Sequence, residues 1–182
     1  MGITIRKAES KDSVGIAHVH VDTWRSAYEG IVPYERLANL SYERSQQMWE
    51  GILRDVKMST FVAEDDSGRI AGFANCGSAR DTKDFGGELY AIYVLQNAQR
   101  MGIGRRLVLA VANDLVARGF SSMLVWVLEE NPSRRFYEGL RGTELESKDI
   151  TIGGKTLKET GYGWKDLNSL ITQLAGFPGR SP

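Results

Sequence analysis

The sequence predicts an α/β fold in which short buried strands alternate with amphipathic helices. Strand-like apolar runs and helix-like segments follow one another up to about residue 164. The apolar fraction of 42% can form a core, and 182 residues suit one domain or one domain with a short appendage. A third observation is the stretch 88–107, which passes from a buried strand through a glycine-bearing turn into a helix. The rest of the chain is organised around this stretch.

Composition and charge disfavour several classes of function. Lys plus Arg and Asp plus Glu both number 23, whereas a nucleic-acid-binding protein usually has a basic excess. No apolar run reaches the roughly 18 residues of a membrane span, and the N-terminus has no signal-peptide core. The lone Cys76 cannot form an internal disulfide, and no Cys/His spacing suggests a metal site. We therefore expect a cytoplasmic protein with no metal, nucleic-acid partner or membrane contact.

The N-terminal half is predicted to contain an edge strand, two helices and a hairpin. Weak alternation over 2–7 indicates the strand, and the first helix runs from about residue 12 to 28. Its apolar face is Val14, Ala17, Val21, Trp24 and Tyr28. Ser41 caps a second helix, with an inner face of Ser45, Trp49, Ile52, Leu53 and Val56. Strands over 60–64 and 70–77 flank a turn at 65–68, as in a hairpin.

The stretch 88–107 has the pattern of an anion-binding site. An apolar run over 89–95 is followed by a polar loop, by Gly102 and Gly104, and by a helix with leucine and valine at helical spacing. The first N–H groups of a helix lack internal partners, and glycines let the main chain approach a phosphate. The glycines alone leave a turn without a ligand equally open. No Gly-Lys-Ser/Thr follows, and the three-glycine dinucleotide spacing is absent.

The C-terminal half is predicted to alternate strands and helices again. A polar loop over 78–87 precedes the central strand, Gly119 ends the central helix, and 122–128 is a buried strand. Asn131 and Pro132 suit the start of a short helix. Two strands, 143–152 and 155–164, flank a glycine turn, and Asp166 caps a last helix. The glycine- and proline-rich tail, 176–182, is expected to be disordered.

The spacing Gln99-x-x-Gly102-x-Gly104 resembles the acyl-CoA signature of the GCN5-related N-acetyltransferase family. That signature reads Arg/Gln-x-x-Gly-x-Gly/Ala, often with glycine where this chain has Arg100. Asn131 at a strand end and the pair Phe136-Tyr137 in the next helix resemble the family's second acyl-CoA wall. The resemblance implies a mixed central β-sheet flanked by helices, with two middle strands splayed around the cofactor.

The resemblance covers residues 1–165, and the C-terminal helix and tail, 166–182, are additional. The helix has an apolar face of Leu167, Leu170, Ile171 and Leu174, which needs a partner. That partner could be its own domain or a second subunit, so a homodimer is one possibility.

The family resemblance also implies roles for individual residues. Acetyl-CoA would be the cosubstrate, and Tyr137 would protonate the departing thiolate. Backbone groups of Ile92, Tyr93 and Val94 would hold the thioester oxygen and the pantetheine arm. The turn would bind pyrophosphate through Gln99, Arg100, Met101, Gly102, Ile103, Gly104 and Arg105. Asn131 would contact pantetheine, and Arg134 could reach the nucleotide phosphates.

The acceptor side is less well defined by the sequence. Glu88 is the candidate base, directly or through water, although a surface carboxylate at a strand end is an equal interpretation. Trp24, Tyr28 and Tyr90 are candidate walls of the acceptor site, and core packing is the alternative for Trp24 and Tyr28.

The leading interpretation is an acetyl-CoA-dependent N-acetyltransferase. It would act on a primary amine, in a small molecule or at a peptide N-terminus, by direct attack on the thioester. One alternative is a non-catalytic acyl-CoA-binding or sensor domain of the same fold. The other is a nucleotide-phosphate-binding module unrelated to CoA.

Overall fold

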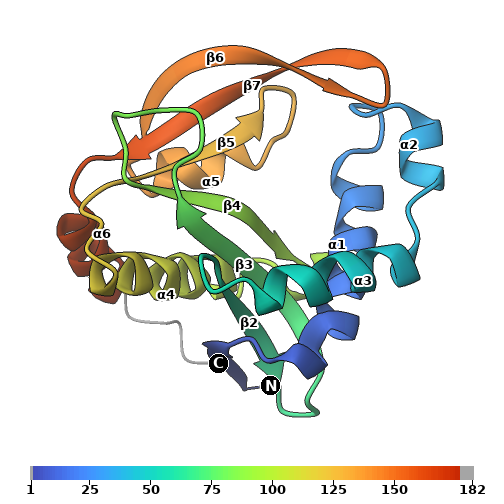
Figure 1. Cartoon of the computed structure of the whole chain (residues 1–182), viewed down its shortest axis with the longest axis horizontal. Coiled ribbons are helices and arrows are strands. Elements are labelled where there is room, and N and C mark those ends of the chain that lie inside the picture. The colour runs from blue at the N-terminus through green and yellow to red at the C-terminus, as the bar shows by residue number, and fades with distance from the viewer. Residues whose placement is uncertain (1, 177–182) are drawn as a thin grey trace.

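A seven-stranded mixed sheet forms the centre of the computed structural model, which describes residues 2–176. The strand order is β1-β2-β3-β4-β5-β7-β6, and only the β4–β5 pairing is parallel. Helices cover both faces of the sheet, as predicted (Figure 1). The strands are β1 (Ile3–Lys7), β2 (Ser59–Asp65), β3 (Ile70–Ser78), β4 (Gly87–Val94), β5 (Met123–Leu128), β6 (Thr143–Ile152) and β7 (Lys155–Trp164).

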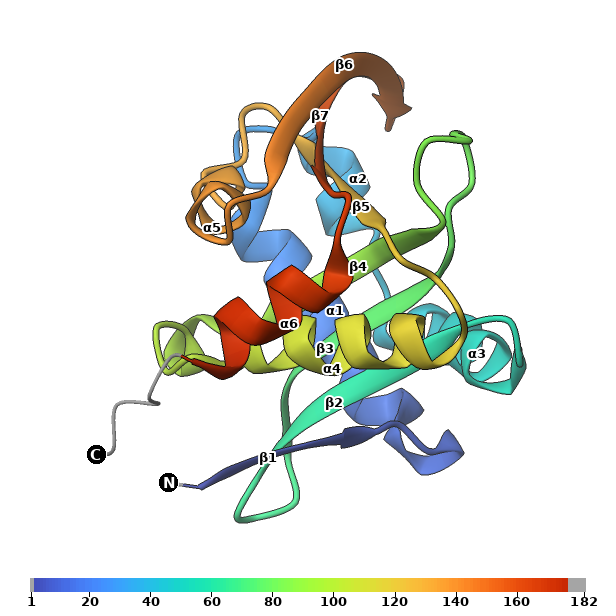
Figure 2. The ribbon, with the colours of Figure 1, turned by 90° about the vertical axis from the view of Figure 1, so that its left-hand side faces the viewer.

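Two helices pack on one face of the sheet and two on the other (Figures 1 and 2). On one face α1 packs against β3, β4 and α3; on the other, α4 packs against the sheet and α6 packs against α4. The helices are α1 (Ser13–Ala27), α2 (Tyr34–Ala38), α3 (Tyr42–Arg54), α4 (Ile103–Ala117), α5 (Arg134–Gly139) and α6 (Leu167–Ala175). Single 3-10 turns, η1 (Ser10–Asp12) and η2 (Gln96–Ala98), precede α1 and α4.

Most predicted elements occur with boundaries within one or two residues. Gly153 and Gly154 both have positive φ in the turn between β6 and β7, a backbone conformation that glycine adopts without strain. The Ser41 side chain accepts a hydrogen bond from the Arg44 N–H and so caps α3. Helix α5 begins at Arg134, later than expected, because 131–133 form a separate turn in which Asn131 accepts from the Ser133 N–H.

Two predicted inner-face positions are wrong. Val56 is 94% exposed because α3 ends at Arg54, before the helical spacing reaches it. Val14 is also exposed, since the buried face of α1 is centred on Ile16 and Val19, where the helix lies between α3 and β3.

The C-terminal helix is part of the same core. Leu167, Leu170 and Leu174 are buried in the main hydrophobic cluster, against α4 (Figure 2). Asp166 caps α6 by accepting hydrogen bonds from the N–H groups of Asn168 and Ser169. The apolar face of α6 therefore has its partner within the chain, and the tail predicted to be disordered lies, from residue 177 on, outside the described residues.

In the part of the chain that the structure describes, no helix is both long and apolar enough to cross a membrane.

Candidate active site

The central sheet opens between β4 and β5. These strands are paired only at Gly87–Met123 and Glu88–Leu124, near their N-terminal ends. Beyond Glu88, β4 is paired with β3 on one side, and no pairing with β5 is present on the other. The backbone of 89–94 therefore presents an inner edge with hydrogen-bonding groups toward the opening. Ile92, Tyr93 and Val94, the predicted thioester-binding residues, lie on this edge.

A bulge in β4 decides which side chains share a face of the sheet. Cys76 pairs with Leu89 and Asn75 pairs with Ala91, so Tyr90 is the extra residue. As a result Leu89 and Ile92 pack in the α4-side core, whereas Ala91 and Tyr93 pack against the α1-side core. Tyr90 donates a hydrogen bond to the Ser78 carbonyl at 2.5 Å and lies under the Arg80 guanidinium. Its contacts are thus with the end of β3 and the loop that follows.

The turn before α4 has the backbone geometry of an anion site. Gly102 has a φ of 78°, and the first intrahelical bond runs from the Arg106 N–H to the Gly102 carbonyl at 3.1 Å. The N–H groups of Ile103 and Gly104 precede that bond, so they have no partner within the helix. A Cβ on Gly104 would approach the Phe136 ring to 3.1 Å, which explains glycine at this position.

Arg100 stands where the family often has glycine, and its φ is 63°, in the left-handed region. The sequence difference thus falls on a backbone conformation that favours glycine. The neighbouring Gln99 side chain donates to the Val94 carbonyl at 3.1 Å, which ties the turn to the end of β4. Met101 is largely exposed beside them.

Two tyrosines, Trp24 and Asn131 meet at the open end of the sheet. The Trp24 indole N–H donates to the Tyr93 hydroxyl at 3.0 Å. The Tyr28 hydroxyl lies near the Tyr93 hydroxyl and the Asn131 side chain and interacts with both. Burial raises the pKa of both Tyr28 and Tyr93, so both are neutral hydroxyls at pH 7.

Tyr137 lies beside this group. It is 6% exposed, and burial raises its pKa well above the usual value for tyrosine. Its ring stacks on Tyr162 at 5.9 Å between centroids, which fixes its orientation. Within residues 2–176 no side chain or carbonyl accepts a hydrogen bond from its hydroxyl. A neutral hydroxyl without a partner, on a side chain that is otherwise buried, can donate to a ligand.

The other predicted cofactor contact on α5 is Arg134. Its Nη1 reaches the Glu129 carbonyl at 3.5 Å, and its Nε lies 3.8 Å from a Glu138 carboxylate oxygen. Both contacts are long and the side chain is partly exposed, so the guanidinium can turn toward an anion.

Glu88 is buried and firmly paired. Its side chain is 3% exposed and takes hydrogen bonds from the Arg80 N–H at 3.0 Å and from the Arg80 guanidinium. Glu88 is paired with Leu124 of β5, and beyond this pair the two strands separate. The sequence did not indicate Arg80 as its partner, because the loop after β3 gives no local signal for this contact.

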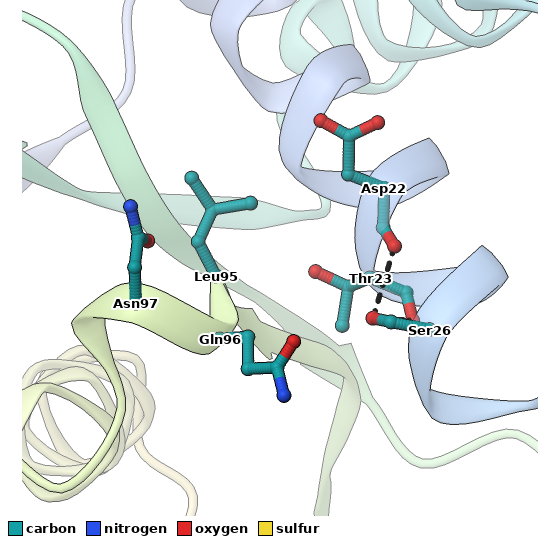
Figure 3. Close-up of a pocket in the computed structure, with 6 residues that line it drawn as sticks. All are labelled: Asp22, Thr23, Ser26, Leu95, Gln96 and Asn97. Atoms are coloured by element: carbon teal, nitrogen blue, oxygen red, sulfur yellow. Dashed lines mark hydrogen bonds between the residues drawn. The ribbon is translucent and has the colours of Figure 1, made fainter.

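An open pocket of about 620 Å³ lies between α1 and the end of β4 (Figure 3). Its walls are Asp22, Thr23, Ser26, Leu95, Gln96 and Asn97. Thr23 is 7% exposed, and its hydroxyl is buried without a hydrogen-bond partner in the described part of the chain. Buried hydroxyls are usually paired, so this one suits a ligand partner. No group of three or more metal-ligating side chains is present among residues 2–176.

Comparison with known proteins agrees with this geometry. Residues 78–150 match the family model described as FR47-like protein. The chain is 43% identical to the uncharacterized N-acetyltransferase YuaI of Bacillus subtilis (strain 168), over 94% of this chain and 98% of that protein. An N-acetyltransferase structure from Staphylococcus aureus Mu50 superposes with a TM-score of 0.71, at 18% identity, over 92% of this chain and 99% of that chain.

A second similar structure is PaiA N-acetyltransferase from Thermoplasma acidophilum, solved in complex with coenzyme A. Its TM-score is 0.68 at 19% identity, over 88% of this chain and 98% of that chain. The splayed sheet and the glycine turn therefore define the fold of the N-acetyltransferases. The extensive identity with YuaI goes further, and the chain belongs to the GCN5-related N-acetyltransferase family.

Proposed function

We propose that this protein transfers an acetyl group from acetyl-CoA to a primary amine, which attacks the thioester directly. The observation that carries the proposal is the opening between β4 and β5, with the anion-binding turn at its end. Pantetheine carries amide groups that can pair with a strand edge, and CoA carries a pyrophosphate that suits a helix N-terminus. The unpartnered Thr23 hydroxyl offers a further hydrogen bond beside Leu95.

In this proposal one side chain gives a proton to the departing thiolate and another takes a proton from the attacking amine. Tyr137 donates a proton to the departing thiolate, because its raised pKa keeps the hydroxyl protonated. Backbone N–H groups of 92–94 stabilise the charge that develops on the thioester oxygen. Glu88 takes the proton from the amine through a water molecule, since its buried carboxylate is enclosed by Arg80. Trp24 and Tyr28 line the acceptor side.

The acceptor is a small-molecule amine or a peptide N-terminus, and we place the reaction in the cytoplasm. The homodimer considered from the sequence rested on an uncovered α6. Because α6 packs on α4, that reason no longer applies.

Calorimetric titration with acetyl-CoA, with ATP as the control, tests the cofactor. We expect micromolar binding of acetyl-CoA and no heat with ATP. Binding of both would favour a general nucleotide-phosphate module, and no heat with either would overturn the proposal. A thiol-release assay over a panel of primary amines then separates an enzyme from a non-catalytic acyl-CoA sensor, because only the enzyme releases CoA in response to an amine.

A further inference from the structure

Strand β7 carries a carboxylate, Glu159, to which the proposed function gives no task. Strand alternation puts it on the same face as Leu157. Leu157 packs in a cluster with Leu128, Trp24 and Tyr28, which line the predicted acceptor side. Glu159 is paired in register with Leu128 of β5, so it lies on the β5 side of the sheet opening. It also interacts electrostatically with Tyr28 and with Glu88.

Glu159 differs from Glu88 in how its charge is balanced. Glu88 receives both the backbone N–H and the guanidinium of Arg80. Glu159 is 13% exposed and has one cationic contact, from its Oε1 to the Lys148 ammonium at 3.5 Å. The structure, over residues 2–176, provides no hydrogen-bond donor for Oε2. Burial raises the pKa of Glu159, so its charged form would gain from a second cation.

The surroundings of Glu159 already bind one primary ammonium group. The Lys148 Nζ lies 4.0 Å from the centroid of the Trp126 ring and 3.3 Å from Asp81 Oδ2, in addition to its contact with Glu159. An aromatic face with carboxylates is suited to an alkylammonium ion. Lys148 would keep Trp126 and Asp81 if it released Glu159, so the exchange of one cation for another leaves no charge unpaired.

We propose that Glu159 receives the ammonium group of the acceptor, so that the protein selects amines that arrive as cations. The inference rests on the proposed function and deepens it, because it names the chemical class of the acceptor. Glu159 acts here as a binding residue, and loss of the proton to Glu88 follows as a separate step. The charged and titratable groups that face Glu159 are Lys148 from β6, Arg80 from the loop after β3, Glu88 from β4 and Tyr28 after α1.

The test compares steady-state kinetics of Glu159→Gln and the unaltered protein with the best alkylamine of the panel. We expect KM for the amine to rise about tenfold or more, the size of one lost charge-assisted hydrogen bond. The kcat and the Kd of acetyl-CoA should stay within about twofold. Glu159→Asp keeps the charge and should recover most of the affinity. An unchanged KM in Glu159→Gln would overturn the inference.

Two further variants make the result specific. Glu146→Gln removes an exposed carboxylate of the same hairpin and should leave KM unchanged. Lys148→Gln removes the competing ammonium and should lower KM, and it can be measured even if Glu159→Gln does not fold. A rise in KM for Lys148→Gln as large as that for Glu159→Gln would overturn the inference, because Lys148 would then be the acceptor contact.

The outcome also distinguishes this inference from the proposed function. If the unaltered protein binds acetyl-CoA and acetylates amines while Glu159→Gln behaves identically, only the inference fails. If the unaltered protein neither binds acetyl-CoA nor releases CoA, the proposed function fails, and the inference fails with it.

Discussion

Tyr137 is the residue on which the proposed chemistry depends most directly. The residue is buried, its hydroxyl is neutral and has no acceptor in the described part of the chain, and its ring is held against Tyr162. Tyr137→Phe removes the proton and keeps the ring packing. We expect kcat to fall by roughly 10²-fold, the low end for general acid catalysis, with acetyl-CoA affinity little changed. Thiol-release kinetics and calorimetry measure the two quantities. A Phe variant with normal turnover would exclude Tyr137 as the acid.

Glu88 can act as a base or only as the partner that holds Arg80, and two substitutions separate these roles. Glu88→Gln removes both the base and the ion pair, whereas Arg80→Gln removes the ion pair and keeps the carboxylate. We expect kcat to fall by about 10²-fold in Glu88→Gln and much less in Arg80→Gln. The measurement is kcat as a function of pH for both. Equal losses would mean that Glu88 only positions the loop after β3.

For individual residues, the sequence predicts which ones belong to the site better than it predicts which side chains they contact. The sequence assigns Asn131 and Tyr137 to the second acyl-CoA wall and Tyr28 to the acceptor side, and the structure brings the three together. Their proximity depends on how α1 and β5 meet, which no local pattern encodes. For the same reason the sequence does not single out Glu159. In the sequence it is one charged residue in an alternating strand, and only its burial in the structure distinguishes it.

Among the elements, the turn before α4 combines the proposed pyrophosphate contacts with backbone strain. Arg100 has a φ of 63°, where glycine is unstrained and a β-branched residue is strongly disfavoured. We expect Arg100→Gly to change the free energy of unfolding by less than about 1 kcal/mol, because relief of strain offsets the added chain entropy. Arg100→Val should lower it by about 1–2 kcal/mol. Urea denaturation measures both. A neutral valine variant would show that the left-handed conformation is not required.

Elements with strong local signals were predicted well. The hairpin β6–β7 has its turn at the two glycines because positive φ is a local requirement, and Asp166 caps α6 through its own side chain. Errors occurred where a neighbour decides the outcome. Val56 continues the helical spacing of α3, but the helix ends at Arg54 and the chain turns toward β2. Whether α6 packs on its own domain likewise required the position of α4.

The whole molecule should lose stability in acid through carboxylates that the fold keeps ionised. Hydrogen bonds from Ser67 and from the Arg69 N–H lower the pKa of Asp65, the last residue of β2, to about 2. Because this folded-state pKa lies below the value of about 3.9 for an unfolded aspartate, the contribution is complete above roughly pH 4. It is lost as the pH falls toward about 2.

Urea denaturation at a series of pH values should therefore show a decline that is shallower in Asp65→Asn. Asp149→Asn, which removes the same charge from an exposed position in β6, is the control and should keep the parental slope. Parallel curves for Asp65→Asn and the parent would contradict the prediction.

The opening between β4 and β5 has a consequence for self-association. A strand with unpaired backbone groups is normally an aggregation hazard, since a strand of another molecule can add to it. Here the unpaired edge of β4 lies inside the sheet, with β5 and β7 across the opening and the hydroxyl groups of Tyr28 and Tyr93 at its end. A strand of another molecule would need a flat, open approach to the β4 edge, whereas a narrow, extended ligand can enter the opening end-on. The fold can thus expose main-chain hydrogen-bonding capacity to a ligand while denying it to other copies of the protein.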